Sequence, residues 1–153
     1  MKFSVSMHHS TFGVGIFGEL IRECGVYAYV RKNHQLCKKK KLSLDILAKY
    51  PCLLFEQDQN SSAFFYEEMI EGLQNHENVI KTCDRASTFE LMKKTDAYAI
   101  GVGIVPKNLN GEDWVAIPLD TKEKMKIVYL KKNNVELSEM AKIFIERLKS
   151  YDT

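Results

Sequence analysis

The stretch from Asp84 to Pro106 constrains the fold of this chain more strongly than any other segment. Its first residues predict a helix, because Ser87 can cap the N-terminus and Glu90, three residues later, completes a capping box. Lys93 and Lys94 then place positive charge where the C-terminal end of a helix favours it. The stretch therefore opens with a helix.

A short strand and a glycine turn follow this helix. Residues 97–100 form an apolar run of strand type, and Gly101 and Gly103 end it with two residues that tolerate positive φ. We expect the pair 104–105 after the turn to be buried, up to the stop at Pro106. A helix, a strand and a turn in this order predict a mixed α/β crossover.

Strands and helices alternate over the rest of the chain as well. β-Branched and aromatic residues predict strands at 3–7, 26–30, 52–55, 79–83, 114–118 and 124–130. Capping serines followed by apolar residues at helical spacing predict helices at 43–50, about 62–75 and 138–148. This alternation predicts a largely parallel sheet with helices packed on it.

The totals are those of an ordinary globular protein. A chain of 153 residues can bury a core as one domain or as two small lobes. Its net charge of +2 does not by itself favour nucleic acid or an acidic membrane as a partner. No apolar run approaches the roughly 20 residues of a membrane span, and residues 1–9 do not read as a signal peptide. We therefore expect a cytoplasmic protein.

The four cysteines predict neither a disulfide framework nor a zinc site. They stand at positions 24, 37, 52 and 83, without a C-x-x-C pair among them. Cys52 and Cys83 lie in strand-like runs, where a free thiol behaves as a small apolar side chain. We expect reduced, structural thiols.

Residues 13–18 match G-x-G-x-x-G, the pattern that binds dinucleotides at the start of a crossover helix. Too few residues follow before the next predicted strand for such a helix to form. His8 and His9 are adjacent and fit exposed loop residues better than metal ligands. A nucleotide-binding enzyme stays an alternative, but we expect no catalytic residue, no metal and no cofactor.

The polar loop 56–62 is the segment whose position suggests a ligand site. It follows a buried strand and leads into a helix N-terminus, and ligands of open α/β sheets bind beyond the carboxyl ends of strands. Free N–H groups at a helix N-terminus suit a carboxylate or a phosphate. A solvated loop with a capping serine fits the same residues equally well.

Five segments, taken in order, resemble the effector-binding (co-inducer) domain of LysR-type transcriptional regulators. The segment 29–36 is similar to the family's strand ending in an H-P-L turn, with Gln35 in place of the proline. The others are similar to the family's helix, proline and strand (42–55), its helix before G-x-G-I-x-x-P (84–106), its l-v-x-i-P-L strand (114–119) and its closing helix (137–144). The resemblance extends over residues 19–150.

This resemblance implies an α/β fold of the type II periplasmic-binding-protein kind, with one complete lobe plus part of the second. Residues 26–130 would form the complete lobe, including crossover strands from Val26 and from Lys126. Residues 1–25 would be a remnant of the first lobe, and 131–153 the C-terminal helix returning to it. The family's winged helix-turn-helix has no counterpart in residues 1–25, so the chain resembles a regulator truncated at its N-terminus.

In this family a small molecule binds between the lobes and shifts their packing, which changes how the dimer or tetramer sits on DNA. The resemblance implies an effector such as an organic acid or an amino acid, a homodimer, and DNA contact only through the missing helix-turn-helix. The ligand-binding residues that it implies are Gln57, Asn60, Ser61, Ser62 and Phe64, with Gly101 and Gly103 bordering the same cleft.

Two further classes of function stay open beside the regulator. A solute-binding protein would share the fold, although the first residues lack a signal peptide. A self-associating α/β interaction module without a DNA-binding role would use the apolar surface that an incomplete lobe exposes.

Overall fold

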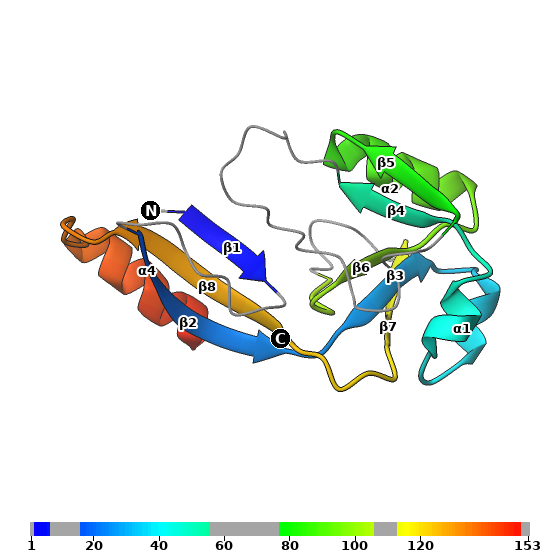
Figure 1. Cartoon of the computed structure of the whole chain (residues 1–153), viewed down its shortest axis with the longest axis horizontal. Coiled ribbons are helices and arrows are strands. Elements are labelled where there is room, and N and C mark those ends of the chain that lie inside the picture. The colour runs from blue at the N-terminus through cyan, green and yellow to red at the C-terminus, as the bar shows by residue number, and fades with distance from the viewer. Residues whose placement is uncertain (1, 7–15, 56–76, 106–112, 151–153) are drawn as a thin grey trace.

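The computed structural model of this protein describes residues 2–6, 16–55, 77–105 and 113–150. Its elements form two groups at opposite ends of the molecule (Figure 1). We call the described residues of 2–24 and 125–149 the terminal group, and the described residues of 27–118 the central group. The chain passes between the two groups twice, after residue 24 and again before residue 125.

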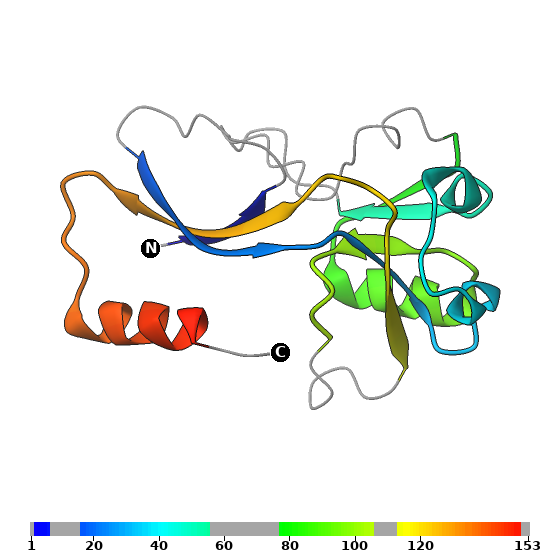
Figure 2. The ribbon, with the colours of Figure 1, turned by 90° about the horizontal axis from the view of Figure 1, so that it is seen from below.

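The terminal group is a three-stranded antiparallel sheet with one helix on it. Its strands are β1 (Lys2–Ser6), β2 (Ile16–Cys24) and β8 (Met125–Lys132), with β8 in the middle. Helix α4 (Glu139–Lys149) lies along one face of this sheet (Figure 2). The predictions of a strand near each end of the chain and of a closing helix are confirmed.

Strand β2 is an element that the sequence analysis did not predict. It begins at Ile16, inside the G-x-G-x-x-G segment, where a dinucleotide-binding fold would place a helix. It pairs with β8, and a bulge between Leu20 and Arg22 shifts the register. The described part of that glycine segment is therefore a strand, which removes the helix that a nucleotide would need.

The central group is built around β3 (Tyr27–Arg31). This strand lies between β6 (Ala99–Gly101) and β7 (Trp114–Pro118) and is antiparallel to both. Strand β4 (Cys52–Phe55) runs parallel to β5 (Val79–Thr82). A parallel bridge between Cys52 and Tyr98 joins β4 to the β6 side, so the strands follow one another in the order β5-β4-β6-β3-β7.

The prediction of a largely parallel sheet is therefore wrong for its centre. Strand β3 continues directly from β2 of the terminal group through Gly25 and Val26. Strands β6 and β7 follow connections within the central group and are antiparallel to β3. Strands β4 and β5 belong to such connections and are parallel, as expected.

Helices cover both faces of the central sheet. Helix α1 (Leu44–Leu47) and the 3₁₀-helix η1 (Gln35–Lys38) contribute Leu47 and Leu36 to the cluster on one face. Helix α2 (Arg85–Lys94) contributes Met92 to the cluster on the other face. Side chains of β3 alternate between these two clusters, which makes this strand the middle layer of the core.

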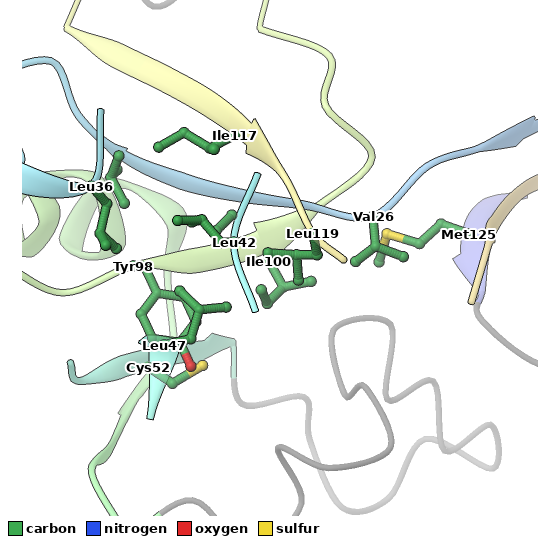
Figure 3. Close-up of a cluster of buried hydrophobic side chains, with 12 residues drawn as sticks. Val26, Leu36, Leu42, Leu47, Cys52, Tyr98, Ile100, Ile117, Leu119 and Met125 are labelled. Atoms are coloured by element: carbon green, nitrogen blue, oxygen red, sulfur yellow. The ribbon is translucent and has the colours of Figure 1, made fainter. Parts of the chain in front are cut away.

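The larger cluster is the main core of the molecule (Figure 3). It consists of Val26, Ala28, Val30, Leu36, Leu42, Leu47, Cys52, Tyr98, Ile100, Ile117, Leu119 and Met125. The hydroxyl of Tyr98 lies beside the sulfur of Cys52 in this cluster, and burial raises the pKa of Tyr98. Removing this apolar surface from water is the main term that stabilises the central group.

The two connections between the groups run side by side and are fastened to each other. The backbone N–H of Leu119 donates a hydrogen bond to the carbonyl of Val26, at 2.9 Å. Val26 also lies against Met125, the first residue of β8 (Figure 3). The two crossovers therefore pack together and form a single connection between the groups.

The helix caps confirm one prediction and correct another. Ser138 caps α4 as predicted, because its hydroxyl accepts the N–H of Ala141 at 3.3 Å. The cap of α2 is Asp84 and not Ser87: the carboxylate of Asp84 accepts the N–H of Ser87 at 2.8 Å. The hydroxyl of Ser87 also donates to this carboxylate at 2.6 Å, and the two hydrogen bonds from Ser87, that of the hydroxyl first, lower the pKa of Asp84. Both residue types can cap, and the backbone begins its helical turn one residue after Asp84.

Two expectations about burial need correction. Cys52 is buried as expected, but Cys83 is exposed, because it follows the last residue of β5 where the chain turns into α2. Ile104 and Val105 are only half-buried, since they follow the glycine turn at the edge of the sheet. All four cysteines are free thiols.

Glu19 joins the sheet of the terminal group to α4. Its carboxylate accepts hydrogen bonds from the hydroxyl of Tyr129 at 2.6 Å and from the ammonium of Lys149 at 3.1 Å. These two bonds lower the pKa of Glu19, and the bond to Glu19 raises the pKa of both Tyr129 and Lys149. The charged carboxylate therefore stabilises the docked position of α4.

We predict that Glu19→Gln destabilises the protein in a pH-dependent manner. The folded pKa of Glu19 lies below its unfolded value of about 4.3, so its contribution is present above that pH and is lost as the pH falls through the folded pKa. Urea-unfolding midpoints of wild type and variant should differ at about pH 7, and the difference should shrink as the pH falls below the unfolded pKa of about 4.3. Glu23→Gln, at an exposed position of the same strand, is the control. A difference that is constant with pH would contradict this role.

Candidate functional site

The edge of the central sheet where β4, β5 and β6 end is the candidate site. Parallel pairing of β4 with β5, and the parallel bridge from β4 to Tyr98, bring the carboxyl ends of these strands to one edge. Ligands of α/β sheets bind at such an edge. The chain that leaves this edge includes the start of α2 and the glycine turn after β6.

Five of the predicted ligand-binding residues lie outside the described residues: Gln57, Asn60, Ser61, Ser62 and Phe64. The helix predicted after them, at about 62–75, lies there too. Their assignment stays a prediction. The strand that precedes them, β4, is confirmed, with Leu53 fully buried against the core under α2.

Gly101 and Gly103, the other two predicted residues, have a packing role in the structure. A Cβ atom on Gly101 would overlap the ring of Tyr29, and one on Gly103 would come within 2.5 Å of the ring of Tyr27. Gly103 also has a φ of 84°, a conformation that favours glycine. The glycines are therefore required by two tyrosines of the neighbouring strand, and a role in ligand binding stays a prediction.

Hydrogen bonds fasten this turn to β3 as well. The hydroxyl of Tyr29 accepts the N–H of Gly103 at 2.8 Å and donates to the carbonyl of Ile104 at 3.4 Å. The sequence analysis missed both tyrosines. One signal in the sequence could have indicated this contact. Tyr27 and Tyr29 are two residues apart, as are Gly101 and Gly103, and this spacing places both residues of a pair on the same face of a strand.

The start of α2 is tied to the ends of β4 and β5. The hydroxyl of Thr82 donates to the carbonyl of Leu54 at 3.4 Å and lies 2.7 Å from the hydroxyl of Thr88. Thr88 in turn donates to the carbonyl of Asp84 at 3.0 Å. This side of the candidate site is therefore held by hydroxyl groups from a strand end and a first helical turn.

A second polar cluster lies at the other end of β3 and is structural. Arg31 forms an ion pair of 2.7 Å with Asp96 and donates to the carbonyl of Thr95. The buried ring of His34 accepts the N–H of Leu36 at Nδ1, which leaves Nε2 to donate to the carbonyl of Asp96 at 3.2 Å. This cluster holds the turn after β3 against the end of α2.

The described part of the chain offers no metal centre. No group of three or more His, Cys, Asp or Glu side chains in residues 2–6, 16–55, 77–105 and 113–150 could hold a metal ion. His8 and His9 fall outside those ranges. Within the same ranges, no helix has the length and apolar character needed to cross a membrane.

Comparison with known proteins identifies the fold. No protein-family profile and no curated protein sequence matches this chain. Solved structures do match, among them HinK, a LysR family transcriptional regulator from Pseudomonas aeruginosa, with a TM-score of 0.66 and 14% identity. The chain has the fold of a LysR-family regulatory domain. The resemblance predicted from the sequence is confirmed at this level.

Two other matches show how much of a regulator this chain covers. The reduced OxyR regulatory domain from Pseudomonas aeruginosa matches with a TM-score of 0.64 and 6% identity, over 96% of this chain and 71% of that one. CbnR, in a structure with its target DNA, matches with a TM-score of 0.64 and 16% identity, over 97% of this chain and 53% of that one. HinK is covered over 51% of its length. The chain thus spans about half of HinK and of full-length CbnR, and a larger share of the OxyR regulatory domain.

We predict that Gly101→Ala destabilises the protein by about 1–3 kcal/mol, because the new methyl group would overlap the ring of Tyr29. Urea unfolding measures this loss. Tyr29→Leu in the same chain should relieve part of the overlap, so the double variant should be more stable than the sum of the two single changes implies. Strict additivity would mean that the two residues do not press against each other.

Proposed function

We propose that this chain is the small-molecule-sensing regulatory part of a LysR-type transcriptional regulator. The observation that supports this most is the agreement between the strand arrangement and the fold of LysR-family regulatory domains. HinK is a LysR family transcriptional regulator, and CbnR is seen with its target DNA. We therefore assign no catalytic role to the chain.

The central group would be the complete lobe and the terminal group part of a second lobe. The range predicted for the complete lobe, residues 26–130, takes in the central group, both crossovers and the first part of β8, which pairs within the terminal group. Residues 1–25 and 131–153 would then make up the rest of the partial lobe. The crossovers at Val26 and Leu119 are hydrogen-bonded to each other, so a change in the angle between the lobes would move both of them together.

The effector would bind at the edge where β4 and β6 end, facing the partial lobe. Gln57, Asn60, Ser61, Ser62 and Phe64 would contact it, and Gly101 and Gly103 would border it. Amide and hydroxyl groups recognise an organic acid or an amino acid by hydrogen bonds without a paired charge. The effector would act by binding one arrangement of the lobes more tightly than another.

The remaining properties follow from the same proposal. DNA would be bound by a winged helix-turn-helix beyond this chain, as CbnR is captured with its target DNA. The regulator would act in the cytoplasm as a homodimer, without a cofactor and without a membrane as a partner.

We predict that binding of an effector acid is weakened severalfold by Ser62→Ala and by Asn60→Ala, because each change removes about one neutral hydrogen bond. Isothermal titration of organic acids and amino acids against the protein measures the affinity. Ser43→Ala is the matched control, since the Ser43 side chain makes no capping hydrogen bond at the start of α1. Unchanged affinity in both site variants would show that the site has been assigned to the wrong residues.

A self-associating module is the second candidate, and an apolar stripe on α4 favours it. The side chains of Met140 and Ile143 lie one turn apart on this helix and are 75% and 55% exposed. Ile145 of the same helix is buried towards the sheet, so the stripe belongs to a different face. Exposed apolar stripes of this kind mark protein interaction surfaces.

We predict that Met140→Glu weakens self-association about tenfold or more, because a charge replaces an apolar side chain that would be buried between copies. Light scattering over a range of protein concentrations measures the mass. Glu146→Gln, at an exposed position of the same helix, should leave the mass unchanged. A wild-type chain that is monomeric at the highest concentration would argue against this second candidate.

A further inference from the structure

Four consecutive lysines, at positions 38–41, form a basic surface on the central group, which we call the lysine run. All four side chains are exposed. The segment 38–49 holds five lysines and one aspartate, so its excess of positive charge is larger than the +2 of the whole chain. The rest of the chain is therefore net negative, and the positive charge is concentrated in this segment.

Most of the lysine run differs from the lysines of the helices, because its charge is not neutralised by neighbouring carboxylates. On α2, Lys94 pairs with Glu90 at 3.7 Å, and on α4, Lys142 pairs with Glu139 at 2.7 Å. Residues 38–40 form no ion pair within the part of the chain that the structure describes. Three consecutive ammonium groups are therefore free to bind an anion.

Both ends of the lysine run are fastened to the rest of the protein. The N–H of Lys39 donates a hydrogen bond to η1 at 2.9 Å. The ammonium of Lys41 lies 2.7 Å from the carboxylate of Asp120 in the second crossover. Directly after the run, the backbone of Leu42 is hydrogen-bonded to this crossover on both sides of Leu119, at 3.0 and 2.7 Å, and the two leucines lie side by side in the core (Figure 3). This anchoring reduces the entropy that the run would lose on binding a partner.

The distribution of charge favours a short acidic peptide over nucleic acid as that partner. Lysine pairs with carboxylates and with phosphates alike. A DNA duplex is a long, stiff polyanion, so it would extend beyond the run onto a chain whose other residues are net negative. Single-stranded nucleic acid is held by stacking on aromatic side chains, and the segment 38–49 contains none. A short peptide avoids both problems, because it contacts only the lysines.

The length of the run sets the length of that peptide. The backbone of Lys39 is extended, with φ of −99° and ψ of 139°. Three extended residues span about 10 Å, so residues 38–40 match three or four successive residues of an extended partner. The long, flexible side chains of lysine can reach carboxylates on either side of such a strand.

We propose that residues 38–40 are a docking surface for an acidic segment of a partner protein, a segment with Asp or Glu at most of four successive positions. None of the predicted effector residues belongs to this surface. The inference goes beyond the regulatory function proposed above, and it holds or fails independently of effector binding and of DNA binding.

Hexaglutamate is the probe, and the full chain labelled with ¹⁵N shows where it binds. At about 20 mM salt, where exposed charges are weakly screened, we expect hexaglutamate to shift the amide resonances of residues 38–42 saturably. The neutral peptide (Ser-Gly)₃ should leave these resonances unchanged. Raising the salt to about 0.5 M should abolish the binding, because it screens exposed ion pairs.

The double variant Lys39→Gln with Lys40→Gln should weaken hexaglutamate binding about fivefold, because two exposed ion pairs are lost. The matched control, Lys94→Gln with Lys142→Gln, removes the same charge from exposed lysines of α2 and α4 and should bind as wild type does.

Three results would overturn the proposal. The first is the absence of saturable shifts at residues 38–42 with hexaglutamate. The second is equal affinity in the two double variants. The third is tighter binding at these residues by a random-sequence DNA duplex than by hexaglutamate at the same concentration of negative charge, which would make this a surface for nucleic acid.

Discussion

The packing of Tyr27 and Tyr29 against the glycine turn is the contact on which the central group depends. The rings occupy the space that side chains at positions 101 and 103 would need, and the hydroxyl of Tyr29 binds the backbone of the turn. This fixes β6 and the chain after it against β3. Because β3 is also the direct continuation of β2, the same strand connects the candidate site to the terminal group.

This connection gives the proposed regulatory function a physical route. In the proposal, an effector at the carboxyl ends of β4 and β6 would contact the turn that Tyr29 holds, and β3 leads from that turn to the crossover at Val26. Val26 is bonded to the second crossover at Leu119 and packs against Met125 at the start of β8. A ligand that favours one geometry at the edge would therefore bias both crossovers.

Signals within a few neighbouring residues predicted most helices and strands. The features that were missed depend on pairing between strands far apart in the sequence. β-Branched and aromatic residues identified β3 and β7, and Ser138 correctly marked the start of α4, because these signals lie within a few residues of each other. Strand β2 was missed because its sequence, with a glycine and three charged residues, does not alternate, and it is stabilised by pairing with β8 over a hundred residues away. The antiparallel centre of the sheet likewise depends on which distant strands become neighbours. The residues predicted to bind the effector in the loop after β4 remain a prediction.

The central claim, that this chain is the sensing part of a DNA-binding regulator, is tested most directly by sequencing the coding DNA upstream of Met1 and mapping the start of translation. The proposal predicts an in-frame winged helix-turn-helix that continues into this chain. A stop codon immediately upstream in the same frame, or an unrelated coding sequence, would contradict it and would leave the self-associating module as the better account.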